Sequence, residues 1–166
     1  MKKIFNAFVF LSLILPSLSF AQQTTNTKES LRGLRGIFVN VLPVAKDAET
    51  DGLSANQLQK IVESELRKAK VPILTESKSG EEYANLVIVV DTIKHPQGVY
   101  LFTVNVSVVQ NVQISRPQGK GIFPAEIYSK RFLGLTTPNR LDIINEPLKE
   151  KVGEFIKDYL AANSKR

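Results

Sequence analysis

The chain has 166 residues and a formal net charge of +6, and it contains no cysteine. The lack of cysteine excludes a small disulfide-stapled scaffold, so packing and hydrogen bonds must hold the fold together. A modest positive charge supports solubility first and does not by itself identify a ligand.

The first 21 residues have the pattern of a secretory signal peptide. Lys2 and Lys3 precede an apolar run over residues 4–15, and Ser19 and Ala21 are the small residues of a cleavage site. The run is shorter than the ~20 residues of a transmembrane helix, and a polar stretch follows it. We therefore expect cleavage after Ala21 and export to the periplasm, with secretion as the alternative and no transmembrane anchor in the mature chain.

Removing 21 of the 166 residues would leave 145, and the loss of two lysines would lower the net charge from +6 to +4. This length fits one domain of ordinary size. We expect a flexible lead-in over 22–34, a single domain over 35–162 and a frayed tail over 163–166. In an exported protein, nucleic acid is not an expected partner.

The first half of the domain predicts two short strands around one helix. Runs rich in β-branched residues at 37–42 and 71–75 predict the strands. Between them, Ser54 and Gln57 have the spacing of a capping box, and the apolar stripe over 58–69 predicts an amphipathic helix.

The second half predicts three strands and a closing helix. The run at 86–90 is apolar at every position, which predicts an interior strand covered on both faces. Strict alternation over 102–114 predicts a long strand with one buried and one wet face, and Gln110 predicts a bulge in it. A fifth strand over 125–135 and an amphipathic helix over 148–160 complete the pattern.

The predicted order is therefore β-α-β-β-β-β-α. Two helices on one face of an approximately five-stranded, mostly antiparallel sheet define an α+β fold in a single domain. The opposite face of such a sheet would present polar side chains such as asparagine, threonine and serine.

Few residues offer catalytic or metal-binding chemistry. His95 is the only histidine, which leaves no histidine pair for a metal, and its position before Pro96 favours a role in a turn. The loop 47–52 resembles the opening of a calcium loop, but Leu58 stands where the bidentate glutamate would be needed. We therefore expect no catalytic residue, no metal and no cofactor.

One basic cluster is a candidate contact site. Arg116 and Lys120 flank a predicted hairpin turn, where their positive charges suit an anion or an acidic partner. An ordinary solvated turn is the competing interpretation of the same residues.

Three segments together resemble a known periplasmic module: the strand at 37–43, the helix that ends over 65–69, and the run at 83–89 before paired long strands. The pattern is similar to the amino-terminal domain of the TolB translocation protein and to CsgG-like domains. It covers most of residues 35–160 and contains no diagnostic motif. The resemblance implies a non-catalytic module that docks onto other envelope proteins, and no functional residue can be transferred from it.

The sequence thus favours a non-enzymatic, exported binding or envelope-assembly accessory module whose partner is another envelope protein. One alternative is a small envelope hydrolase with a carboxylate-based site, for which Asp91 and Glu126 are the acids within predicted strands. Another is a self-associating sheet protein, which would require the long strand to lie at an edge. The oligomeric state is left open.

Overall fold

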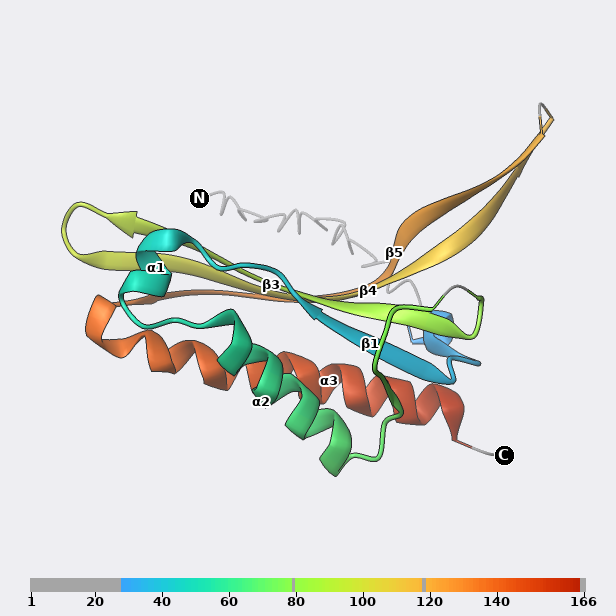
Figure 1. The fold of residues 1–166 in the computed structure, drawn as a ribbon, viewed down its shortest axis with the longest axis horizontal. Coiled ribbons are helices and arrows are strands. Elements are labelled where there is room, and N and C mark those ends of the chain that lie inside the picture. Colours follow the sequence, from blue (N-terminus) through green and yellow to red (C-terminus); the bar gives the residue numbers. More distant parts are fainter. Residues whose placement is uncertain (1–27, 79, 118, 165–166) are drawn as a thin grey trace, which may run out of the picture.

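Five strands form one mixed sheet in the order β2-β1-β3-β4-β5 (Figure 1). The computed structural model describes residues 28–78, 80–117 and 119–164. The strands are β1 (Gly36–Val41), β2 (Ile73–Leu74), β3 (Tyr83–His95), β4 (Val99–Arg116) and β5 (Gly119–Thr136). The predicted α+β class and order are confirmed.

The helices lie on one face of this sheet (Figure 1). They are α1 (Lys46–Thr50), α2 (Ala55–Lys68) and α3 (Asn145–Asn163), with short 3-10 segments η1 (Glu29–Leu31) and η2 (Pro138–Ile144). The two long helices are the predicted ones, and α1 is a single turn in a segment predicted as loop. In the described ranges, no helix is both long enough and apolar enough to span a membrane.

Strand direction divides the sheet into two parts. The long pairings β3–β4 and β4–β5 are antiparallel, as predicted, whereas the shorter pairings of β1 with β2 and β3 are parallel. A parallel pair needs a crossover connection, and α2 supplies it between β1 and β2. The hydrophobic face of α2 is thereby brought against the sheet.

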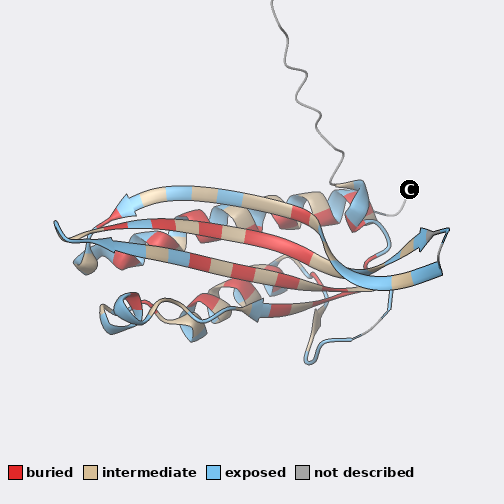
Figure 2. Cartoon of the chain, turned by 90° about the horizontal axis from the view of Figure 1, so that it is seen from above, coloured by how far each residue is buried: buried red, intermediate tan, exposed pale blue. Residues whose placement is uncertain are grey.

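The core lies between the helices and one face of the sheet. On β4, the side chains of Phe102, Val104, Val106 and Val108 are buried, while Thr103 and Asn105 on the other face are partly exposed. The predicted alternation is confirmed, and Figure 2 shows it from the side of the uncovered face. The helices contribute buried residues Leu58, Val62, Leu66, Leu148, Val152, Phe155 and Tyr159.

Two expectations about local structure are wrong. The β3 run is not covered on both faces, because Leu86 and Ile88 are buried but Val87 and Val89 are only partly so. Helix α2 starts after Ser54 as predicted, yet the Ser54 side chain makes no capping hydrogen bond. Burial of Leu53 and Leu58 at the start of the helix is therefore the better supported reason for where it begins.

The described part of the expected flexible lead-in, residues 28–34, belongs to the domain. Leu31 and Leu34 are buried in the core. The Tyr159 hydroxyl donates to the Leu34 carbonyl oxygen at 2.8 Å, and the Asn163 side-chain amide donates to the Leu31 carbonyl oxygen at 2.9 Å. Asn163 is thus helical and hydrogen-bonded rather than frayed. Through these bonds α3 holds the segment around Leu31 and Leu34 in place.

A bulge bends the β4–β5 hairpin. The register shifts between Val108 and Val109, where Tyr128 and Glu126 are the partners and Ile127 has none. The bulge therefore lies on β5, close to but not at the predicted Gln110. The Ser30 hydroxyl donates to the Ile127 carbonyl oxygen at 2.7 Å, which satisfies a group that the bulge removes from the ladder.

We expect Val106→Asp to unfold the domain and Asn105→Asp to change its stability by less than about 0.5 kcal/mol. Val106 is fully buried, and an unpaired buried charge costs several kcal/mol of a total of about 5 to 15 kcal/mol. Asn105 faces the uncovered side, and aspartate keeps the oxygen that Arg131 Nε contacts at 3.4 Å. Thermal unfolding of both variants checks this, and equal losses would contradict the one-sided burial of β4.

Candidate functional site

The part of the β4–β5 hairpin beyond the bulge, residues 109–126, projects from the body and is here called the arm. Figure 1 shows it curving away from the helices. Pairing continues along it from Val109–Glu126 to Arg116–Gly119, so it is a regular two-stranded ribbon. A bulge at its base increases the local twist and redirects the strands, which explains why the arm leaves the plane of the sheet.

One face of the arm is apolar although no helix covers it (Figure 1). Val112 lies opposite Phe123 and Ile114 lies opposite Gly121, on the face that continues the buried row of β4. The side chain of Phe123 is 49% exposed. Monomeric proteins seldom leave apolar side chains together in water without a binding role.

The other face of the arm is mainly polar. It carries Asn111, Gln113, Lys120 and Glu126, with Val109, Pro124 and Ile122 as apolar exceptions, of which Ile122 is 72% exposed. The arm is therefore an amphipathic ribbon whose two faces differ in chemistry.

Gly121 is required by the position of the Phe123 ring. A Cβ atom added to Gly121 would collide with that ring, which lies over the glycine backbone. An aromatic side chain over a strand glycine shields the backbone that the glycine exposes. At the base of the arm, the Gln110 side chain donates to the Glu81 carbonyl oxygen and fixes the arm to the loop before β3.

The structure places the two predicted contact residues at the far end of the arm. Arg116 pairs with Gly119, and Lys120 pairs with Ser115 in the neighbouring step. Lys120 is exposed. The basic residues farther along β5 do not join them, because Lys130 lies 3.5 Å from Glu154 on α3 and Arg131 lies on the uncovered face. Sequence reasoning found the tip but missed the apolar face beside it.

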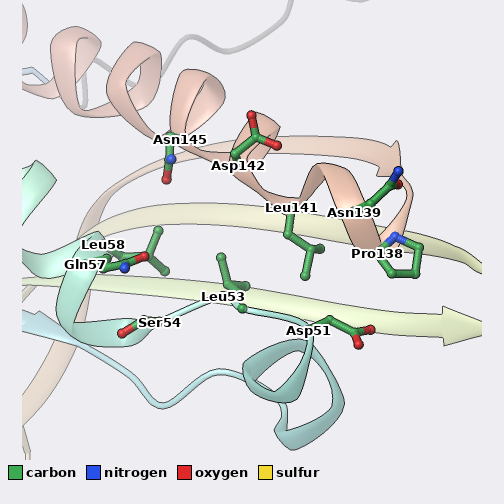
Figure 3. Close-up of a pocket in the computed structure, with 11 residues that line it drawn as sticks. Asp51, Leu53, Ser54, Gln57, Leu58, Pro138, Asn139, Leu141, Asp142 and Asn145 are labelled. Atoms are coloured by element: carbon green, nitrogen blue, oxygen red, sulfur yellow. The ribbon is translucent and has the colours of Figure 1, made fainter.

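A cavity of about 280 Å³ lies between the α1–α2 connection and η2 (Figure 3). Leu53 and Leu141 point toward each other across it, and polar side chains surround them (Figure 3). The polar and acidic lining residues are Asp51, Ser54, Gln57, Asn139, Asp142 and Asn145.

The Asp51 carboxylate at this cavity is already bonded. Lys94 Nζ lies 2.6 Å and the Tyr100 hydroxyl 2.7 Å from its Oδ2 atom. The Lys94 hydrogen bond lowers the pKa of Asp51, and the same contact raises the pKa of Lys94. Burial, followed by the Asp51 contact, raises the pKa of Tyr100. None of the three is adjusted toward proton transfer near neutral pH, and together they tie the α1–α2 connection to the β3–β4 hairpin.

Two acids of the loop 47–52 have hydrogen-bond partners within the protein. The first part of this loop is helix α1, in which Asp47 Oδ1 accepts a hydrogen bond from the Ala48 backbone at 2.8 Å, while Asp51 is bonded as above. Among the residues that the structure describes, no three His, Asp or Glu side chains are grouped so that they could hold a metal ion.

The remaining catalytic candidates lie apart. His95 ends β3 in an exposed turn, where its Nδ1 atom accepts from the Gln97 backbone at 3.3 Å. Asp91 lies opposite Thr103, whereas Glu126 lies opposite Val109, six β4 residues away. This offset corresponds to about 20 Å along the strands. Paired glycosidase carboxylates are about 5 to 9.5 Å apart, so Asp91 and Glu126 do not form such a site.

Comparison with known proteins adds no assignment. No protein-family model matches the chain, and no curated protein sequence matches it. The resemblance to TolB-like and CsgG-like modules therefore stays a prediction from the sequence pattern.

We expect Asp51→Asn to destabilise the protein at neutral pH and to make less difference in acid. Because folding lowers the pKa of Asp51, the ionised carboxylate stabilises the folded protein. This stabilisation is present above the unfolded pKa of ~3.9 and is lost as the pH falls through the folded pKa. Urea unfolding of both proteins between pH 7 and pH 3 measures the difference. Asp142→Asn, on the other side of the cavity, is the control, and its stability should differ little from that of the wild type. If Asp51→Asn lowered the stability by the same amount at every pH in this range, the ion-pair role would be contradicted.

Proposed function

We propose that the mature protein is a non-enzymatic, exported accessory module of envelope assembly that acts by binding another envelope protein. The observation that carries this proposal is the arm, a projecting ribbon with an uncovered apolar face. The signal-peptide pattern of residues 1–21 supports a periplasmic location, and the resemblance to envelope-docking modules is consistent with the same role.

The arm is suited to bind a partner through its side chains. Covering apolar surface contributes about 25 cal/mol for each Å² removed from water, and Val112, Ile114 and Phe123 present such surface together. Aromatic anchors at the centre of a patch usually supply the largest share of binding energy. We therefore assign the central contact to Phe123.

The two edges of the arm differ in their capacity to accept a strand. Pro124 lies on the β5 edge and lacks the N–H group that a further strand would need. The β4 edge is free beyond Val109, because β3 pairs with β4 only as far as Asn85–Val109. A partner segment that adds a strand would therefore add it beside β4.

The tip of the arm favours an acidic partner. Arg116 and Lys120 are two basic residues at the end of the ribbon, in its last two paired steps. Charges at the rim of an interface increase the rate of encounter more than the final affinity. Salt should consequently slow association with such a partner.

We expect Phe123→Asp to abolish capture of an envelope partner, because a carboxylate replaces the apolar anchor. The measurement is affinity capture from an envelope extract, followed by identification of the proteins that are retained. Gln113→Asp introduces the same charge on the opposite face of the same arm and should retain capture. Equal capture by both variants, or none by the wild type, would refute binding through the arm.

We also expect protein recovered from the periplasm of cells expressing the full chain to begin at Gln22. Small residues at positions 19 and 21 direct the cleavage. Intact mass and amino-terminal sequencing measure the product. A retained leader, or protein found only in the cytoplasm, would contradict export.

A further inference from the structure

The face of the sheet away from the helices carries an apolar patch at the end opposite the arm. Ile93, Leu101 and Leu135 are neighbours in one row across β3, β4 and β5, and Leu133 lies in the next row. Their exposed fractions are 66%, 40%, 69% and 63% for Ile93, Leu101, Leu135 and Leu133. Figure 2 views the molecule from this side. We call these four residues the open-face patch.

A hollow of about 510 Å³ adjoins the open-face patch. Its lining residues are Val89, Asp91, Thr103, Asn105, Arg131, Phe132 and Leu133. The short side chain of Thr103 lies in the row between Asp91 and Leu133, so this part of the sheet is lower than the leucines beside it. A protruding apolar side chain would fit there.

Two opposite charges flank this hollow without pairing with each other. Asp91 on β3 lies opposite Thr103, and Arg131 on β5 lies opposite Asn105, so they are diagonal across β4. Their backbone positions are separated by two strand spacings across the sheet and by two residues along the strands, which together give about 12 Å. Both are exposed, and in the described part of the chain neither has an ion-pair partner; Arg131 only contacts Asn105.

We propose that the open-face patch binds a second copy of this chain in a two-fold symmetric dimer. A symmetric interface brings the same surface of both copies together, so every contact between unlike residues occurs twice. A surface with one unpaired acid and one unpaired base beside an apolar patch is complementary to itself. This inference goes beyond the proposed role of the arm, which lies at the other end of the sheet.

The symmetry gives defined contacts. The two-fold axis lies between the two sheets and runs perpendicular to the line from Asp91 to Arg131. Rotation about this axis places each aspartate opposite the arginine of the other copy. The same rotation brings Leu133 of one copy over Thr103 and Leu101 of the other, where the hollow can accept it. The strands of the two sheets then cross steeply, which corresponds to the orthogonal class of sheet packing.

The area of contact follows from the steep crossing of the two sheets. Four strand spacings of ~4.8 Å in each direction give an overlap of about 20 Å by about 20 Å, or roughly 400 Å². A standard stable interface buries about 800 Å² on each partner, so this contact belongs with the smaller, weaker interfaces. Charge pairs across such a contact fix its orientation more than they add to its affinity.

Charge reversal tests the pairing directly. Asp91→Arg would place an arginine opposite Arg131 of the second copy, and Arg131→Asp would place an aspartate opposite Asp91 of the second copy. Like charges then face each other twice in each case, so each variant should be monomeric. An equimolar mixture of the two should form a heterodimer, because all four charges across that interface are then opposite. The double variant, Asp91→Arg with Arg131→Asp, should dimerise as the wild type does.

The measurement is molar mass by light scattering and sedimentation, on protein purified from cells expressing the full chain. Glu126→Arg reverses an exposed acid on the same sheet side within the arm and is the matched control that should stay dimeric. Leu133→Asp should be monomeric and should not be rescued by mixing with either charge variant. Unchanged thermal unfolding of the single variants shows that they are folded.

Four outcomes would overturn the inference. The first is a wild-type protein that stays monomeric at high micromolar concentration, the second is a pair of charge variants that both stay dimeric, and the third is a mixture that forms no heterodimer. A different protein retained on this face in place of a second copy would overturn it as well. Each of these results leaves capture by the arm unaffected, so failure here is distinguishable from failure of the proposed function.

Discussion

The structure depends on the one-sided burial of β4, the strand that pairs with both β3 and β5. Its residues Phe102 to Val108 place alternate apolar side chains under α2 and α3, and the adjacent strands follow that alternation through their register. Because the side-chain period of a strand is two, a shift of one residue would expose this whole row. The register of β4 therefore determines both the core and the composition of the uncovered face.

The same strand connects the two proposed binding surfaces. Where β4 leaves the body, its apolar row continues through Val112 and Ile114 without a helix to cover it, and the arm results. Toward Leu101, the row on the other face becomes apolar as well, and the open-face patch results. The two surfaces lie at opposite ends of β4, so different residues form the surface proposed for a second copy and the surface proposed for another partner.

The sequence predicted those parts of the fold that depend on local pattern. The stripe in α2, the alternation in β4 and the positions of Arg116 and Lys120 near a turn were all visible in the residues themselves. The sequence was less informative where burial or register depends on neighbouring strands and layers. Val87 and Val89 have the composition of buried residues, but no second layer lies over them, and the bulge at Ile127 depends on how β5 meets β4.

The sequence by itself determined the order of elements, the α+β class and the expectation of export, because each follows from local composition and periodicity. Only the tertiary structure decided which apolar residues stay uncovered, that β1 pairs in parallel with two strands, and that Asp91 and Glu126 are too distant to act together. Those properties follow from strand pairing and layer coverage. Both join residues far apart in the chain, so no local pattern encodes them.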